Sequence, residues 1–283
     1  MAAFTTLEEH RCFGGVQSFH EHPSATVGLP MRFGVYRPAQ ALAGRRVPVL
    51  FYLAGLTCNE QTFAIKAGAQ RLAAERGWLL VTPDTSPRAT GVEGAEADWD
   101  FGTGAGFYLD ATQPPWSTRW RMESWITGEL RELVMAGFGG LPERTGIFGH
   151  SMGGHGALTL ALRHPGLFRS ASAFAPICAP SEVPWGHKAF SGYLGADRQA
   201  WAEHDACALI ESGRRAPPLL VDQGLADSFL ATQLRPDRLI QACESTGQPL
   251  TLRRHEGYDH GYFFVASFVA DHFAHHAAAL GAG

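Results

Sequence analysis

Short apolar segments alternate with longer helix-like segments along most of the 283-residue chain. The apolar segments are too short for helices, and most run into Gly, Pro or Asp, as central strands of a parallel sheet do. The alternation therefore predicts an α/β fold with a mostly parallel sheet and helices on both faces. The predicted strands are 47–53, 78–81, 145–148, 170–174, 219–221 and 250–254, and the predicted helices are 61–74, 123–135, 153–163, 236–245 and 262–279.

Three regions do not follow the alternation. Residues 27–36 alternate in polarity and are interrupted by Gly and Pro, which predicts antiparallel edge strands before the parallel core. Segments 83–120 and 175–204 are long, irregular and rich in Gly, Pro, Trp and Phe. We expect them to be functional loops over the carboxyl ends of the strands, where open α/β sheets bind ligands. Neither of these two segments has the low-complexity composition of a linker between domains. Residues 1–283 are therefore predicted to form one domain.

The charge balance and the cysteines exclude several classes. A formal net charge of −4 without a Lys/Arg block argues against nucleic acid or an anionic membrane as partner. No apolar run approaches the roughly 20 residues that cross a bilayer, and the N-terminus has no signal-peptide pattern. Five widely spaced cysteines without a CxxC pair favour reduced thiols and offer no zinc motif. The expected compartment is the cytoplasm.

The strongest motif is Gly149-His-Ser-Met-Gly153, which matches the GxSxG nucleophile elbow of α/β hydrolases. A predicted strand leads into it and a predicted helix leads out, as the elbow requires. A bare GxSxG also occurs as a simple glycine-rich turn, but this context favours Ser151 as the nucleophile. The following helix would direct its positive end toward developing negative charge.

The general base is expected late in the chain, because α/β hydrolases place Ser, acid and His in that order. His260 lies between the last predicted strand and the final helix. His255 lies nearby, at a strand end. His272, His275 and His276 have a spacing that could bind a metal, but a solvated helix face is the better interpretation. His150 and His155 flank the serine too closely to act as its base and more plausibly support the elbow.

The acid is expected after the preceding strand, which offers two aspartates. Asp222 ends the strand and could equally cap or brace the loop. Asp227 lies five residues farther on, where a carboxylate can reach the imidazole from behind, and it is preferred. The two oxyanion-hole amides are expected from Met152, directly after the nucleophile, and from Leu56, in the loop after strand 47–53.

Taken together, the motifs closely resemble the S-formylglutathione hydrolases of the esterase D family, from about residue 12 to residue 280. The resemblance is carried by Tyr52-Leu-Ala-Gly-Leu-Thr-Cys58, Pro83-Asp-Thr-Ser-Pro87, Trp99-Asp-Phe-Gly-Thr-Gly-Ala-Gly-Phe-Tyr108, Gly146–Gly156, Phe174-Ala-Pro-Ile-Cys178, Pro184–Leu194, Asp222–Asp227 and Gly257-Tyr-Asp-His260.

The resemblance implies a cytosolic serine hydrolase that splits S-formylglutathione into formate and glutathione during formaldehyde detoxification. It carries the triad roles to Ser151, Asp227 and His260 and the oxyanion amides to Leu56 and Met152. It also implies activity on short-chain and aryl esters, no metal or organic cofactor, and a homodimer. The chain departs from the expected pattern at Gly261, where we expect serine, and at His255-Glu256.

Three residues are weaker candidates for substrate binding. Cys58 follows the oxyanion loop, and similar enzymes carry there a thiol that makes them sensitive to cysteine reagents; a small buried residue is an equal interpretation. Trp185 and Lys188 either line the acyl pocket or meet the glutathione carboxylates, or they simply pack. The same ambiguity applies to Trp99, Asp100 and Phe101.

Three hypotheses for function follow. The first is a thioester hydrolase acting on S-formylglutathione, and the second is a broader carboxylesterase or acyltransferase that uses the same acyl-enzyme. The third, a non-catalytic binding module, predicts a degraded triad, and all three candidate residues are present here.

Overall fold

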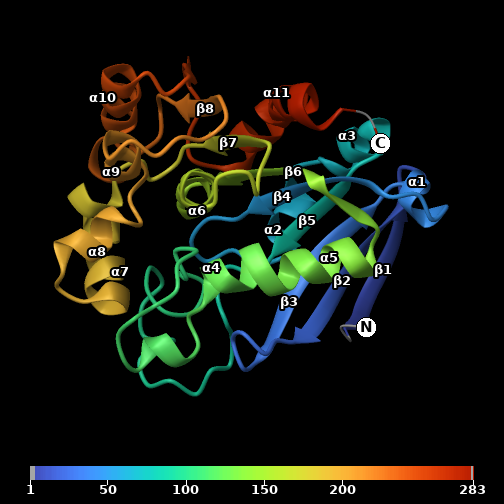
Figure 1. The fold of residues 1–283 in the computed structure, drawn as a ribbon, viewed down its shortest axis with the longest axis horizontal. Coiled ribbons are helices and arrows are strands. Elements are labelled where there is room, and N and C mark those ends of the chain that lie inside the picture. The colour runs from blue at the N-terminus through green and yellow to red at the C-terminus, as the bar shows by residue number, and fades with distance from the viewer. Residues whose placement is uncertain (1–3, 282) are drawn as a thin grey trace.

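The computed structural model describes residues 4–281 and 283. A nine-stranded sheet runs through the molecule in the order β1-β2-β3-β5-β4-β6-β7-β8-β9, with helices on both sides (Figure 1). The strands are β1 Thr5–Cys12, β2 Gly15–Pro23, β3 Pro30–Arg37, β4 Val47–Leu53, β5 Leu79–Pro83, β6 Gly140–His150, β7 Ser170–Phe174, β8 Leu219–Gly224 and β9 Leu250–His255.

The parallel part of the sheet extends from β5 through β4, β6, β7 and β8 to β9. Every residue of β4, β5, β7 and β8 is buried, so these strands are covered on both faces. Burial on both faces explains why β4 reads as a continuous apolar run rather than as an alternating one. The predicted α/β fold is confirmed.

The antiparallel part is larger than predicted. Of the segment 27–36, only Pro30 onward forms a strand, because a turn with Gly28 at φ 70° precedes it. The hairpin of β1 and β2 was not predicted. All of β1 except Cys12 is exposed, so this edge strand lacks the alternation of a half-buried strand.

The helices follow the predicted order with changed bounds. The predicted helix 61–74 is two helices, broken where Gly68 takes φ 65°, and the predicted helix 123–135 contains a π-helical segment. Several of these helices contact one another: α3 packs beside α11, and α9 packs against both α6 and α10. The helices are α1 Ala39–Leu42, α2 Thr62–Lys66, α3 Gln70–Arg76, η1 Trp116–Thr118, α4 Met122–Ser124, η2 Trp125–Leu130, α5 Arg131–Gly137, α6 Met152–Arg163, η3 Pro180–Glu182, α7 Pro184–Leu194, α8 Arg198–Ala202, α9 Ala206–Glu211, η4 Leu230–Leu234, α10 Pro236–Thr246 and α11 Tyr262–Leu280.

The two expected loops behave differently. Segment 83–120 is irregular apart from short bridges and η1. The loop prediction for 175–204 is wrong, because η3, α7 and α8 lie within it. In α7 the buried residues Trp185, Ala189, Phe190 and Tyr193 recur at helical spacing. That periodicity outweighs the two glycines that suggested a loop.

The solvated face expected for His272, His275 and His276 is also wrong. His272 and His276 are fully buried between α11 and the sheet. Ser172 Oγ lies 2.8 Å from His272 Nδ1 and 2.9 Å from His276 Nε2, and Ser170 Oγ lies 2.6 Å from His276 Nδ1. The histidine spacing therefore marks a buried row of hydrogen bonds between α11 and β7, which the pattern of hydrophobic residues in the sequence does not reveal.

Neither a membrane-spanning helix nor a cluster of metal-ligating side chains is found among residues 4–281 and 283. Within these residues no helix has both the length and the apolar character of a membrane-crossing segment. The same residues contain no group of three or more His, Cys, Asp or Glu side chains arranged to hold a metal ion.

Candidate active site

Ser151 occupies a sharp turn between the end of β6 and the start of α6. Its backbone has φ 59° and ψ −121°, a conformation that residues other than glycine rarely adopt. Its amide donates to the Phe174 carbonyl at 2.9 Å, which ties the turn to β7. A Cβ atom on Gly149 would lie 2.2 Å from the Gly153 carbonyl oxygen, and one on Gly153 would lie 2.0 Å from the Leu53 carbonyl oxygen. The glycines of the motif are therefore required by close backbone packing.

His260 and Asp227 lie in line behind the serine. His260 Nε2 is 2.9 Å from Ser151 Oγ, and His260 Nδ1 is 2.6 Å from Asp227 Oδ2. The Asp227 side chain is fully buried, and its other oxygen accepts the Phe229 amide at 2.8 Å. A carboxylate at Nδ1 favours the tautomer with hydrogen on that atom, which leaves the Nε2 lone pair facing the hydroxyl. The arrangement can activate Ser151 as a nucleophile.

Asp222, the other candidate acid, has different partners. Its carboxylate accepts from Arg253 Nε at 2.6 Å and lies 3.2 Å from His272 Nε2. Burial alone would raise the pKa of Asp222, but the hydrogen bonds from His272 and Arg253 outweigh burial and hold the pKa far below its usual range. Asp222 therefore braces the end of β8 against β9 and α11.

The loop after β4 lies directly against the serine. A Cβ atom on Gly55 would be 3.1 Å from Ser151 Cβ. The loop is held by Tyr108, whose hydroxyl donates to the Ala54 carbonyl at 2.7 Å, and by Thr57, whose amide donates to the Gly104 carbonyl at 2.9 Å. Leu56 lines the pocket above this loop, and Met152 begins α6. The two predicted oxyanion residues thus come from different segments, Leu56 from the loop that packs against Ser151 and Met152 from the position directly after it.

A cavity of about 240 Å³ opens onto the serine and histidine. Its walls combine the elbow, the loop after β4, the end of α2, the Trp99 loop, the start of α7 and the start of α11. It is lined by Gly55, Leu56, Cys58, Thr62, Lys66, Trp99, His150, Ser151, Trp185, Phe229, His260 and Tyr262.

Of the three weaker candidates for substrate binding, two line the cavity and one does not. Trp185 lines the cavity, with its ring 4.7 Å from that of Phe229 and 5.8 Å from that of Trp99. Cys58 also lines it, and burial raises the pKa of this thiol, which keeps it protonated. Lys188 does not line the cavity.

Lys188 instead holds the loop that carries Trp99. Its ammonium group is bonded to Asp100 and lies 3.1 Å from Asp98, so it contacts the residues on both sides of Trp99. Asp98 and Phe101 pair across this turn, and the Phe101 ring stacks on Tyr193 of α7 at 4.5 Å. Lys188 therefore fixes the position of a pocket wall.

Several residues of the pocket were not predicted. Lys66 and Thr62 come from α2, and Phe229 and Tyr262 are close neighbours of Asp227 and His260 in the sequence. That proximity was the available signal for the two aromatic residues. His150 also lines the pocket, with its ring 4.5 Å from that of His260. Burial lowers the pKa of His150 well below its usual value, so this neighbour of the base stays neutral.

The departures near His260 do not touch the reacting atoms. The His255 ring stacks on Phe268 at 3.8 Å, which places it in the packing between β9 and α11. The Gly261 amide donates to the Asp259 carboxylate at 2.8 Å just before α11 begins.

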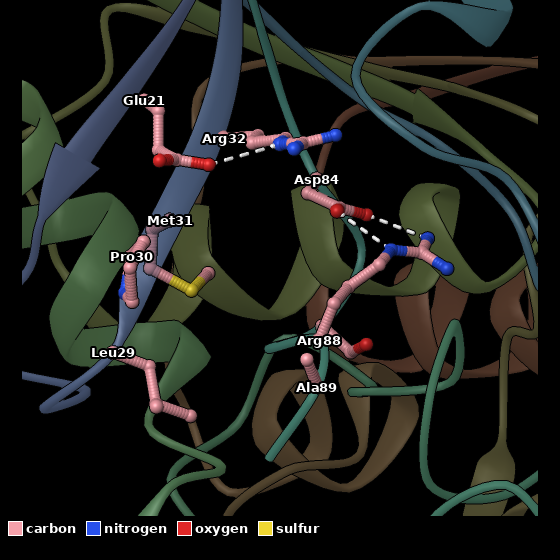
Figure 2. Close-up of a pocket in the computed structure, with 9 residues that line it drawn as sticks. Glu21, Leu29, Pro30, Met31, Arg32, Asp84, Arg88 and Ala89 are labelled. Carbon is pink, nitrogen blue, oxygen red and sulfur yellow. Dashed lines mark hydrogen bonds and ion pairs between the residues drawn. The ribbon is translucent and has the colours of Figure 1, made fainter. Parts of the chain in front are cut away.

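A second cavity of about 260 Å³ lies away from the serine. Figure 2 shows its walls, where Asp84 pairs with Arg88 and Glu21 with Arg32. The described residues that line it include no histidine and no cysteine, and the hydroxyl side chain among them, Ser86, donates to the Pro87 carbonyl at 2.7 Å. It therefore lacks a nucleophile paired with a base.

A mostly parallel sheet with a serine at the strand-to-helix elbow defines an α/β hydrolase of the serine hydrolase class. A family model described as "putative esterase" matches residues 24–275. The S-formylglutathione hydrolases of mouse and cattle are 50% and 49% identical to this chain, each over 99% of the chain and 100% of the relative. The solved S-formylglutathione hydrolase of Agrobacterium tumefaciens is 47% identical, with a TM-score of 0.95 over 98% of this chain and 99% of that one. The chain belongs to the S-formylglutathione hydrolase family.

Proposed function

We propose that this enzyme hydrolyses S-formylglutathione to glutathione and formate through a formyl-enzyme on Ser151. The observation that carries the proposal is the continuous contact from Ser151 Oγ through His260 to the buried Asp227 carboxylate, at 2.9 and 2.6 Å. Membership of the family supplies the substrate, since the mouse and cattle relatives carry that name.

In the first half-reaction the serine oxygen attacks the formyl carbon. His260 Nε2 takes the hydroxyl proton as the C–O bond forms, and Asp227 stabilises the resulting imidazolium. The carbonyl oxygen becomes an oxyanion, which the backbone amides of Leu56 and Met152 would hold. Collapse of this intermediate breaks the C–S bond, and the proton on Nε2 passes to the departing glutathione sulfur.

In the second half-reaction water replaces the thiol. His260 takes a proton from water as the water oxygen attacks the formyl carbon of the ester. The tetrahedral intermediate then collapses, and the proton returns to Ser151 Oγ as formate leaves. The neutral state of His150 suits this cycle, because a second cation beside His260 would oppose formation of the imidazolium.

The deciding measurement compares kcat/KM for S-formylglutathione with kcat/KM for short p-nitrophenyl esters. We expect the thioester to be preferred, and the variants Ser151→Ala and His260→Ala each to lose several orders of magnitude without additivity. A preference for the simple esters by orders of magnitude would refute the assignment.

That second outcome would identify a broad short-chain carboxylesterase or an acyltransferase. The aromatic walls formed by Trp99, Trp185 and Phe229 favour an aryl ester as an additional substrate. Adding an alcohol as a competing acceptor separates the two activities, because a transferase forms the new ester whereas a hydrolase releases only the acid.

The family resemblance also supports a cytoplasmic homodimer of one-domain subunits that acts in formaldehyde detoxification. Analytical ultracentrifugation tests the dimer and a single cooperative unfolding transition tests the domain. Fractionation of the source cells tests the location, and growth of a gene-deletion strain in formaldehyde tests the pathway.

A further inference from the structure

Among the described residues that line the active-site cavity, one carries a fixed charge, and the proposed mechanism does not use it. Lys66 lies in the last turn of α2 and contributes to the cavity wall. Lys66 and Lys188 are the only two lysines in the sequence. Lys188 is neutralised by Asp98 and Asp100, so Lys66 is the lysine whose charge remains available to a ligand.

Lys66 has no carboxylate within ion-pair distance among residues 4–281 and 283. Its ammonium nitrogen lies 5.6 Å from the centre of the Tyr262 ring, which also lines the cavity. Burial raises the pKa of the nearby Cys58 thiol, and Lys66 is among the groups that oppose this rise. The charge of Lys66 therefore acts on the cavity interior and is not cancelled by the protein.

The cavity is too small to enclose the whole substrate. At about 240 Å³ it falls below the roughly 300–1,000 Å³ of pockets that bury a drug-sized ligand. The formyl group and the sulfur must reach Ser151, so the ends of the tripeptide extend past the rim. Glutathione has a carboxylate at each end, and it approaches a protein of net charge −4. A cation at the rim offsets this unfavourable long-range interaction.

We propose that Lys66 is the anion-binding residue of the leaving-group subsite and holds a carboxylate of glutathione. This inference rests on the proposed function for the identity of the thiol. Lys66 does not contact the reacting atoms in this scheme, so it determines specificity by binding and takes no part in proton transfer.

The test crosses enzyme variants with substrate charge. The substrates are S-formylglutathione and its analogue with both carboxylates converted to carboxamides. The variants are Lys66→Gln, Lys66→Arg and Arg71→Gln. Arg71 is exposed on α3, does not line the cavity, and provides a control with the same change in net charge.

We expect Lys66→Gln to lower kcat/KM for S-formylglutathione about fivefold, through KM, because an exposed ion pair contributes at most about that factor. The diamide should be hydrolysed equally by wild type and variant. Lys66→Arg should retain most of the wild-type value, and Arg71→Gln should retain all of it. Added salt should reduce the preference for the charged substrate in the wild type and in Arg71→Gln but not in Lys66→Gln.

An equal loss on both substrates, or no loss on either, overturns the assignment of Lys66. A separate measurement keeps this outcome distinct from failure of the proposed function. Glutathione is tested as an inhibitor of p-nitrophenyl acetate hydrolysis, which requires binding of the thiol but not turnover of its formyl ester. Weaker inhibition of Lys66→Gln supports the subsite even if S-formylglutathione is a poor substrate, and unchanged inhibition contradicts it.

Discussion

Asp222 and Asp227 lie five positions apart in the sequence, and in the structure they have different partners, from which we expect separable roles. Replacing each by asparagine removes a charge at almost constant volume. In Asp227→Asn the group facing His260 Nδ1 at 2.6 Å is no longer a carboxylate. In Asp222→Asn an amide replaces a buried carboxylate that accepts both from Arg253 and from His272.

The two substitutions are expected to affect different quantities, kcat for Asp227→Asn and the free energy of unfolding for Asp222→Asn. Loss of the carboxylate behind His260 favours the wrong imidazole tautomer and should lower kcat about 10⁴-fold, or about 5 kcal/mol, with little change in stability. In Asp222→Asn the NH₂ group of the amide would face an N–H donor of Arg253 or His272, and no hydrogen bond can form between two donors. Arg253 is one-third exposed and keeps Asp271 as a partner, so we expect the low end of the penalty, about 3 kcal/mol. For a chain of 283 residues that corresponds to a fall in Tm of about 5 °C.

The assay measures both properties on each variant. Hydrolysis of p-nitrophenyl acetate gives kcat at a temperature where all variants are folded, and thermal unfolding followed by circular dichroism gives Tm. Asp271→Asn is the matched control, because it removes an exposed carboxylate from the same Arg253 and should change neither quantity appreciably.

The reverse pattern would refute the reasoning. If Asp222→Asn is folded and inactive while Asp227→Asn keeps most of its activity, then Asp222 is the acid of the triad. Equal loss of activity in two folded variants would also contradict the separation of roles.

Three further results are expected. Burial lowers the pKa of His155 to about 3 and of His20 to about 4, against 6.5 when unfolded, so the unfolded chain binds more protons below about pH 6.5. Each histidine should therefore cost about 2 kcal/mol of stability at about pH 5, and urea unfolding that gives the same free energy as at neutral pH would contradict this. Lys188→Met should release the Trp99 loop and raise KM for aryl esters more than it lowers kcat; an unchanged KM would show that the loop needs no clamp. Gly153→Ala should abolish activity or folding, since its Cβ would lie 2.0 Å from a backbone oxygen of β4, and a fully active variant would exclude the tight elbow.

Much of the parallel core follows directly from the sequence. The ranges predicted for β4 and β7 agree with the observed strands Val47–Leu53 and Ser170–Phe174. A strand buried on both faces, such as β4, consists of apolar residues over its whole length, and β7 is apolar apart from Ser170 and Ser172, so local sequence locates both strands. The elbow is likewise recognised from its local GxSxG pattern, although the close contact that restricts Gly153 is with Leu53 of β4, a hundred residues earlier.

The edges and the pocket walls depend on contacts between distant segments. The exposed β1 gains its partner only by pairing with β2, and α7 is recognised once its buried face is known. Two buried histidines of α11 are satisfied by serines of β7 about a hundred residues earlier.

The sequence by itself determined the candidate catalytic groups of this protein: a serine at an elbow, a late histidine and the aspartates that could serve it. The tertiary structure decided which aspartate meets His260, and which lysine faces the cavity. Lys188 is neutralised by Asp98 and Asp100, which lie some ninety residues earlier, whereas Lys66 is left facing the pocket. A side chain's charge is encoded locally, but whether that charge is cancelled depends on which distant groups the fold brings within a few ångströms.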